Sequence, residues 1–250
     1  MAREAAQLLA GYRGKVATEF KGALDPVTEA DRAAEKFLLE ALAARYPEDG
    51  FLGEEGSSRP SRSGYLWVAD PLDGTVNFAH GLPHYAVSLA LLKDGVSLAG
   101  AVVHAAAPEC FTAERGSGAF RNGVRLKTSA LADPDRALAA TDFPYDRQAR
   151  LGRGAARVKA FLGAFQVVRI QGSAALDICR VAAGELELYA GDGTRPWDVA
   201  AAALILEEAG GRITTWTGEP LDLLDPTFPL ASNGPLHDFS LKLFRELDPC

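Results

Sequence analysis

The spacing of apolar positions changes character along the chain and predicts three kinds of segment. Apolar residues recur at helical spacing in residues 2–11 and again in residues 28–46, where Pro47 ends the pattern. From residue 86 the pattern becomes that of strands. Two apolar runs flank a Lys-Asp-Gly turn and predict a hairpin, and residues 110–114 continue the sheet.

After residue 133 short apolar runs alternate with helical stretches, which is the rhythm of an α/β unit. Glycines and prolines mark most of the changes from one element to the next. We find no internal repeat and no low-complexity tract. The predicted strands here are 137–141, 165–170, 186–190, 212–215 and 230–231, and the predicted helices are 155–162, 172–183, 197–209 and 237–247.

Residues 65–78 carry the first candidate chemistry. An apolar run from Tyr65 predicts a buried strand, and Pro71 predicts that this strand ends at Asp70 in a sharp turn. Such a turn can direct the carboxylates of Asp70 and Asp73, with the Leu72 carbonyl between them, toward one point. Hard cations such as Mg²⁺ prefer oxygen ligands of this kind. The alternative is an ordinary Asp- and Gly-rich turn.

Other candidate positions also have plain structural explanations. Asp31 lies three residues after Thr28, as in a variant of the capping box that starts a helix. Taken alone, Glu54 in Gly-Glu-Glu is better explained as part of an exposed acidic loop. Asp198 lies in the first turn of a helix, where the helix dipole favours an acid. Gly172, Ser173 and Ala174 open a helix, where free N–H groups suit an anion and Ser173 suits an ordinary N-cap.

Composition narrows the class of protein. The 250 residues are 48% hydrophobic, enough for one large core or two modest ones. We interpret the chain as one domain, residues 1–250, with approximate halves 1–132 and 133–250. The net charge of −7 and the lack of a basic stripe argue against a nucleic-acid binder. His80 and His84 have Gly and Pro between them, so we expect surface positions rather than a helical zinc pair.

We also expect a cytoplasmic location. No apolar run approaches the roughly 18 residues of a membrane span, and the N-terminus lacks the pattern of a signal peptide. Cys110, Cys179 and Cys250 lie far apart, as expected of two core residues and a terminal thiol in a reducing compartment.

The joint order of the acidic motifs resembles the inositol monophosphatase family of Mg²⁺-dependent, lithium-sensitive phosphatases. The likeness covers nearly the whole chain, including Lys21, residues 25–31 and Asn122-Gly123. The Asp-Pro-Leu-Asp-Gly-Thr and Trp-Asp-Val-Ala-Ala motifs are specific, whereas Gly-Glu-Glu alone is weak. The motifs are residues 53–55, 70–75 with Asn77-Phe78, 172–174, 197–201 and 208–211.

The resemblance implies a layered α-β-α-β-α sandwich, an α/β or α+β fold, usually in a homodimer. It places one metal on Glu54, Asp70 and the Leu72 carbonyl, and a looser third metal near Glu54. A second metal falls on Asp70, Asp73 and Asp198. Thr75, oriented by Asp31, would help Glu54 deprotonate a water. The substrate would bind at Asp73, Gly74, Thr75, Gly172, Ser173, Ala174 and Asp198.

The chemistry agrees with this interpretation. Phosphate monoesters hydrolyse so slowly that enzymes need accelerations of up to about 10²¹-fold. Paired divalent cations can activate water and stabilise the leaving oxygen, and they also relieve the repulsion among clustered carboxylates. A haloacid-dehalogenase phosphatase would need its two acids two residues apart rather than three, and an EF-hand would need alternating acids. A regulatory relative that binds transcription or ribosome components is the alternative from another class.

One position departs from the family pattern. Many relatives have a glutamate that contacts inositol hydroxyls seven residues before the position of Asp198, and this chain has Gly191, followed by Asp192. We therefore expect extra room beside the leaving group. We predict a broad phosphatase that accepts inositol-1-phosphate and bulkier esters such as fructose 1,6-bisphosphate. Gly191→Glu is expected to shift the preference toward the inositol ester.

Overall fold

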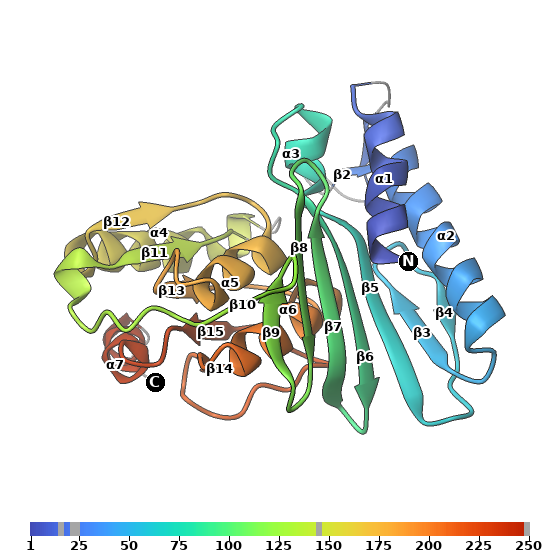
Figure 1. Ribbon diagram of the computed structural model, residues 1–250. Coiled ribbons are helices and arrows are strands. Elements are labelled where there is room, and N and C mark those ends of the chain that lie inside the picture. Colours follow the sequence, from blue (N-terminus) through green and yellow to red (C-terminus); the bar gives the residue numbers. More distant parts are fainter. Residues whose placement is uncertain (15–17, 21–25, 144–146, 248–250) are drawn as a thin grey trace.

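Two β-sheets and three layers of helices alternate through the molecule (Figure 1). In the computed structural model, which describes residues 1–14, 18–20, 26–143 and 147–247, helices α1 and α2 cover the outer face of the larger sheet. Helices α5 and α6 fill the space between the sheets, and α4 and α7 cover the outer face of the smaller one. This is the α-β-α-β-α sandwich that the resemblance implied, so the predicted fold class is confirmed.

The larger sheet has eight strands and is antiparallel except for one parallel pair, β3 with β5. That pair is central to the site because it places the ends of two strands side by side. The strands, in sheet order, are β10 (Val124–Arg125), β9 (Gly118–Arg121), β8 (Glu109–Glu114), β7 (Val96–His104), β6 (Ala86–Lys93), β5 (Tyr65–Asp73), β3 (Gly50–Gly53) and β4 (Ser58–Arg59).

Strand β5 differs from the sequence prediction at its end. The strand does not stop at Asp70 but continues through Pro71 to Asp73. Its pairing with β6 runs regularly to Asp70 opposite Ser88, then resumes with a shifted register at Asp73 opposite Ala86. Proline lacks an N–H and is tolerated in a sheet where the ladder is interrupted. The proline therefore produces a bulge within the strand rather than its end.

The smaller sheet has five strands, and its core is parallel. Strand β11 pairs in parallel with β12 and β13, while β15 pairs antiparallel with β13 and β14. A separate two-stranded ribbon joins β1 (Thr18–Phe20) to β2 (Pro26–Thr28). In sheet order the five strands are β12 (Val167–Arg169), β11 (Leu138–Thr141), β13 (Leu188–Ala190), β15 (Pro229–Ser232) and β14 (Arg212–Thr215).

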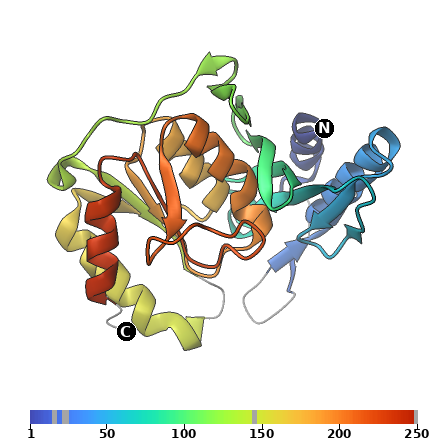
Figure 2. The ribbon, with the colours of Figure 1, turned by 90° about the horizontal axis from the view of Figure 1, so that it is seen from below.

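The helices match the sequence predictions closely, with two exceptions. Helix α4 is longer than expected, and the short α3 was not predicted. Figure 2 shows α4 and α7 side by side against one sheet, and they are in contact. The helices are α1 (Ala2–Tyr12), α2 (Glu29–Arg45), α3 (Thr75–Ala79), α4 (Arg147–Ala164), α5 (Ala174–Ala182), α6 (Pro196–Glu208) and α7 (His237–Leu247), with a 3₁₀ turn at Pro134–Arg136.

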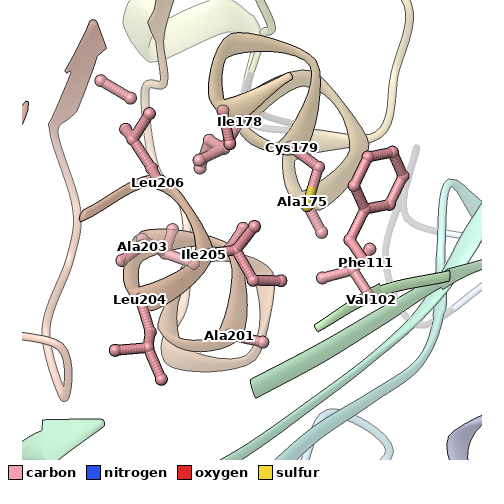
Figure 3. Packing of buried hydrophobic residues seen from close by; sticks show 14 of the residues in the cluster. Val102, Phe111, Ala175, Ile178, Cys179, Ala201, Ala203, Leu204, Ile205 and Leu206 are labelled. Carbon is pink, nitrogen blue, oxygen red and sulfur yellow. The ribbon is translucent and has the colours of Figure 1, made fainter. Parts of the chain in front are cut away.

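The central core lies between the sheets (Figure 3). Helix α6 is apolar on all sides, as expected of a helix enclosed by other elements. Gly100 of β7 allows a close approach to α6, because a Cβ at Gly100 would meet the backbone oxygen of Ala201 at 2.9 Å. Ile178 and Cys179 of α5 pack into the same cluster. The short side chains therefore determine how closely the layers stack.

Several smaller predictions are also decided. Cys110 and Cys179 are buried free thiols, as expected of core residues, whereas Cys250 lies outside the described residues. His80 is exposed and His84 is half-buried. Strand β9 lies at residues 118–121, where the apolar pattern predicted no strand. In the part of the chain that the structure describes, we see no helix with the length and apolar character of a membrane span.

Candidate active site

The end of β5 and the start of α3 form the centre of the candidate site. Asp70 is 1% exposed, and its Oδ1 accepts a hydrogen bond from the backbone N–H of Leu72 at 2.8 Å. Gly74 follows with a φ of 101°, a conformation that side chains disfavour. A Cβ there would also lie 2.9 Å from the carbonyl oxygen of His84. The glycine thus permits the tight turn that directs Asp70 and Asp73 to one side.

Glu54 reaches this turn through the parallel pairing of β3 with β5. Gly53 lies opposite Ala69 in the register, and the Glu54 N–H donates to the Ala69 carbonyl at 3.3 Å. Glu54 is half-buried and leaves the sheet beside the residue that precedes Asp70. The alternative of an exposed acidic loop is therefore wrong in part, because Glu54 and Glu55 are both half-buried.

Asp31 and Thr75 meet although 44 residues separate them in the sequence. Thr75 Oγ1 lies 3.0 Å from Asp31 Oδ1 and 3.0 Å from the Leu72 carbonyl oxygen, the two acceptors available to its hydroxyl proton. The other Asp31 oxygen accepts from the Thr28 N–H and hydroxyl at 2.8 and 2.6 Å. The capping box is therefore present, and the same carboxylate also contacts Thr75. Both explanations of Asp31 are compatible.

Asp73 joins the turn to the start of α5. Its Oδ2 accepts from the Ser173 hydroxyl at 2.5 Å and from the Ala175 N–H at 2.8 Å. Ser173 is also the N-cap of α5, and its Oγ accepts from the Leu176 N–H at 3.4 Å. Gly172 precedes it with a φ of 78°. Segments 70–75 and 172–174 therefore adjoin through direct hydrogen bonds.

Asp198 comes from the start of α6. Its Oδ2 accepts from the backbone N–H of Arg195 at 2.7 Å, which holds the carboxylate at the helix N-terminus. The preceding Trp197 carbonyl accepts from the Ser88 hydroxyl at 2.9 Å, so β6 fixes the helix start against the larger sheet. The helix-start explanation of Asp198 is thus compatible with a position beside the other acids.

The profile of the inositol monophosphatase family matches residues 1–248. The chain belongs to this family.

Curated proteins with several different names are similar in sequence to this member of the inositol monophosphatase family. "Phosphatase IMPL1, chloroplastic" from Arabidopsis thaliana is 40% identical over 92% of this chain. The matched region covers only 63% of the length of that plant protein. "Putative Nus factor SuhB" from Neisseria meningitidis serogroup B is 40% identical over 87% of this chain and 85% of its own length. "Fructose-1,6-bisphosphatase/inositol-1-monophosphatase" from Thermotoga maritima is 34% identical over 98% of this chain and 93% of its own.

Solved structures agree with the inositol monophosphatase fold. The extragenic suppressor protein SuhB from Bartonella henselae has a TM-score of 0.93 at 34% identity, covering 98% of this chain and 95% of that one. An "IMPase/NADP phosphatase complexed with Mg2+ and phosphate" has a TM-score of 0.84 at 26% identity, covering 96% and 90%. The likeness holds over both sheets and all helix layers.

The charges of Glu54, Asp73 and Asp198 all act on Asp70, as expected of acids that lie in one region of this family member. Loss of hydration, followed by the charges of Glu54, Asp73 and Asp198, raises the pKa of Asp70 well above its usual value. Loss of hydration, followed by the charges of Glu54 and Asp73, also raises the pKa of Asp198 well above its usual value. Burial raises the pKa of Asp73 to about 6, although its hydrogen bonds from Ser173 and Ala175 oppose the shift. Three separate segments of chain therefore bring four carboxylates together.

The donor set suits a hard cation. Carboxylate oxygens and a backbone carbonyl are the ligands that Mg²⁺ accepts, and a cation would relieve the mutual repulsion that raises the pKa values of Asp70 and Asp198. Among the described residues, no group of three or more His, Cys, Asp or Glu side chains stands ready to hold a metal ion. The assignment of Glu54, Asp70, Leu72, Asp73 and Asp198 as ligands stays a prediction.

Gly191 corrects an expectation. A Cβ at this position would lie 2.8 Å from Thr194 Cγ2, 2.9 Å from the Tyr189 hydroxyl and 3.0 Å from Pro229 Cγ. The missing side chain therefore leaves no room beside it, because neighbouring groups fill the space. The Asp192 side chain is fully buried and paired with Arg153 and Arg157 at 3.1 and 3.2 Å. Gly191→Glu would need backbone or side-chain shifts, so it is not a clean test of specificity.

Asn77 is a residue whose contribution the sequence did not indicate. Its Nδ2 donates to the carbonyls of His84 and Gln171, both at 2.7 Å. It thereby ties α3 to the segment that leads into α5, across 94 residues of sequence. Its place inside the family motif was the available signal. Lys21 and Asp25, which belong to the resemblance, lie outside the described residues.

Proposed function

We propose that this chain is a Mg²⁺-dependent phosphomonoesterase that hydrolyses inositol-1-phosphate and related sugar phosphates by direct attack of water, without a phosphoenzyme. The observation that carries the proposal is the convergence of Glu54, Asp70, Asp73 and Asp198 beside the Thr75–Asp31 pair. Membership of the inositol monophosphatase family and the names of its relatives support a phosphatase.

In this proposal the acids divide between cation positions. Glu54, Asp70 and the Leu72 carbonyl hold one, Asp70, Asp73 and Asp198 hold a second, and a third lies more loosely near Glu54. Mg²⁺ bound there would neutralise phosphate oxygens, lower the pKa of a water and stabilise the leaving oxygen. A solved structural neighbour whose title names Mg²⁺ and phosphate supports the choice of ion.

The chain's own groups handle the proton. Asp31 and the Leu72 carbonyl are the acceptors for the Thr75 hydroxyl proton, so a lone pair of Thr75 Oγ1 remains to accept a hydrogen bond from the attacking water. We assign to Glu54 the role of the general base that takes up the proton lost by this water. Asp31 acts through Thr75 and is a positioning residue rather than a catalytic one.

Backbone groups hold the substrate. The first N–H groups of α3 have no partner within that helix, and their partial positive charge suits an anion. At α5 the N–H groups of Ala175 and Leu176 already bond Asp73 and Ser173, so only the first N–H, that of Ala174, would face the substrate. Gly74 and Thr75 would bind the phosphate, and Gly172, Ser173 and Ala174 would line the opposite side. Asp198 would accept a hydrogen bond from a substrate hydroxyl. The hydrogen bonds that Asp73 accepts from Ser173 and Ala175 hold these two segments next to each other.

Release of inorganic phosphate from inositol-1-phosphate, with Mg²⁺ and with EDTA, tests the activity. We expect turnover only with Mg²⁺. In ¹⁸O-labelled water, each released phosphate is expected to contain one ¹⁸O atom from the solvent. We expect no phosphate to be bound covalently to the protein. An isolable phosphoenzyme, or turnover that is insensitive to EDTA, would contradict the mechanism.

We further propose a broad substrate range that includes fructose 1,6-bisphosphate. A relative from Thermotoga maritima carries both activities in its name, and Gly191 supplies no carboxylate to bind substrate hydroxyls. A charged hydrogen bond of this kind is worth about 1.5–3 kcal/mol, or roughly 10- to 150-fold in kcat/KM. Comparing kcat/KM for the two esters tests this. A preference for inositol-1-phosphate above about a hundredfold would contradict it.

A second role is favoured by the relative named as a Nus factor, which suggests a regulatory binding partner of transcription or ribosome machinery. The net charge of −7 makes direct nucleic-acid binding a poor fit, so such a role would use protein contacts. An Asp73→Asn chain without turnover separates the two. If it restores function in cells that lack the gene, the regulatory role is primary.

We also propose that the protein is a cytoplasmic homodimer. The buried free thiols of Cys110 and Cys179 suit a reducing compartment, and the family resemblance implies the dimer. Light scattering coupled to size-exclusion chromatography is expected to give twice the chain mass of 26.5 kDa. A monomer at micromolar concentration would contradict the dimer.

A further inference from the structure

Helix α2 presents two buried acids one turn apart to the site. Asp31 and Glu35 are each 1% exposed and lie on the same helix face as Ala34, Leu38 and Leu42, which pack toward the larger sheet. Asp31 contacts Thr75, as described above. Glu35 belongs neither to the proposed metal ligands nor to the proposed substrate-binding residues. A carboxylate this buried requires partners within the protein.

The partners of Glu35 are two backbone N–H groups in the loop that follows Glu54. Its Oε2 accepts from the Glu55 N–H at 2.7 Å, and its Oε1 accepts from the Ser57 N–H at 2.9 Å. The loop also closes on itself, since the Gly53 N–H donates to the Ser57 carbonyl at 2.9 Å. Each carboxylate oxygen thus holds one N–H of the loop that carries Glu54.

Gly53 shows how closely this carboxylate approaches the loop. A Cβ at Gly53 would lie only 2.2 Å from Glu35 Oε2 and 2.5 Å from its Cδ. Glu35 can therefore approach the loop this closely because the first residue of the Gly-Glu-Glu motif has no side chain. On its other side, the Glu54 N–H donates to Ala69, next to Asp70. Glu54 is fixed between the strand that carries Asp70 and the acceptor on α2.

We propose that Glu35 is a positioning residue that holds the 53–57 loop so that the Glu54 carboxylate faces Asp70, and that it sets the affinity for the divalent cation. This inference rests on the proposed function. Charge-assisted hydrogen bonds to backbone N–H groups are stronger than neutral ones. Groups that orient metal ligands typically change metal affinity or activity by about 10- to 100-fold when altered. Through Asp31 and Glu35, α2 sets the positions of both Thr75 and Glu54.

The test is Mg²⁺ binding to the full chain, measured by calorimetry and by the Mg²⁺-dependent shift in melting temperature. Glu35→Gln leaves one acceptor oxygen and turns an amide NH₂ toward the second N–H. We expect Mg²⁺ binding about 10- to 100-fold weaker, with most of kcat restored at saturating Mg²⁺. Glu40→Gln, on the exposed face of the same helix and paired with Lys36, is the matched control and is expected to bind normally.

A double-mutant cycle separates positioning from bulk stability. In a Glu54→Gln background, Glu35→Gln is expected to weaken Mg²⁺ binding no further, because the ligand that it positions is gone. If Glu35→Gln fails to fold, the same titration is made on Glu35→Asp, which keeps the charge but is one methylene shorter. That variant is again expected to bind Mg²⁺ more weakly.

Two outcomes would overturn the inference in different ways. If a folded Glu35 variant has an unchanged dissociation constant for Mg²⁺, even with a lower melting temperature, Glu35 only stabilises the loop. Wild-type protein that binds no Mg²⁺ overturns the proposed function, and with it the role of Glu35. The wild-type titration therefore distinguishes the two failures.

Discussion

Asp73 illustrates how one residue combines structural and chemical tasks. One oxygen, Oδ2, accepts both protein hydrogen bonds, from Ser173 and Ala175. The other oxygen remains for a cation in the proposed function. An asparagine with its carbonyl at the Oδ2 position can keep both protein hydrogen bonds. The substitution therefore tests the proposed chemistry with little change in the fold.

We predict that Asp73→Asn lowers kcat by several orders of magnitude, because it removes a ligand of the second cation. Without metal at pH 7 it is expected to be at least as stable as the wild type. Burial raises the pKa of Asp73 from 3.8 to about 6. The protonated Asp73 carboxyl therefore supports the folded state below pH 3.8, and this contribution to stability is lost as the pH rises through 6. Phosphate release and urea unfolding in EDTA measure both effects. Near-normal turnover in folded protein would overturn the two-metal assignment.

His237 supplies the opposite pH dependence. It is fully buried between Ser232 and Thr214, whose hydroxyls lie 2.7 and 3.0 Å from its ring nitrogens. Burial lowers the pKa of His237 from 6.5 to about 4. Its neutral form thus supports folding above pH 6.5, and that support is lost as the pH falls through about 4, because the unfolded chain binds the proton first.

We predict that this loss of stability depends on His237 itself. Between pH 6.5 and 4, the free energy of unfolding of the wild type is expected to fall more steeply than that of His237→Gln. Urea unfolding in EDTA at several pH values gives the comparison. Parallel pH profiles for the two proteins would show that another group is responsible.

At the scale of elements, the contact between β7 and α6 is set by the absence of a side chain. Gly100 has ordinary backbone angles, so its role is space rather than conformation. A Cβ at Gly100 would have only backbone atoms of Ala201 as its nearest neighbours, at 2.9, 3.1 and 3.4 Å. Backbone atoms of a packed helix cannot turn aside as a flexible side chain can.

We predict that Gly100→Ala lowers the free energy of unfolding by about 1–3 kcal/mol, as expected of an overpacked core. Gly152→Ala is the matched control, because Gly152 lies in α4 with open space around its Cβ position. That change is expected to stabilise the protein by about 0.4–1 kcal/mol. Urea unfolding of both variants measures the difference. Equal effects of the two substitutions would contradict the tight contact.

In the molecule as a whole, the proposed cation site would link folding to divalent cations. Its acids lie just after β3, in β5 and in α6, so the proposed site exists only when the larger sheet and the central helix layer are assembled. A ligand that binds only the folded state stabilises it, by about 2.7 kcal/mol at a concentration of 100 times Kd. Cation binding and global stability are therefore expected to change together.

We predict that EDTA lowers the melting temperature and Mg²⁺ restores it, with a larger effect at pH 7 than at pH 4. Burial and the neighbouring acids raise the pKa of Asp70 and of Asp198, so acidification favours the protonated carboxyls, and these compete with cation binding more at pH 4 than at pH 7. Calorimetric melting at both pH values provides the measurement. A melting curve at pH 7 that is indifferent to EDTA and Mg²⁺ would count against the site.

Most of the element order was predictable, because it depends on local chemistry. The Asp94-Gly95 turn has the left-handed angles, φ of 51° and 77°, that its sequence predicts for a tight hairpin. The capping box at Thr28 and Asp31 was equally readable. The prediction for Pro71 was wrong, because whether a proline ends a strand or sits in a bulge depends on the partner strand, here β6.

The site divides in the same way. The family could be identified from the amino-acid sequence, since the order and spacing of the acidic motifs are properties of the chain alone. The contacts depend on folding: Asp31 meets Thr75, Glu35 holds the Glu54 loop, and the space at Gly191 is filled by Thr194, Tyr189 and Pro229. Most of these contacts join segments far apart in sequence. Their distances follow from strand pairing and layer packing, which local patterns do not encode.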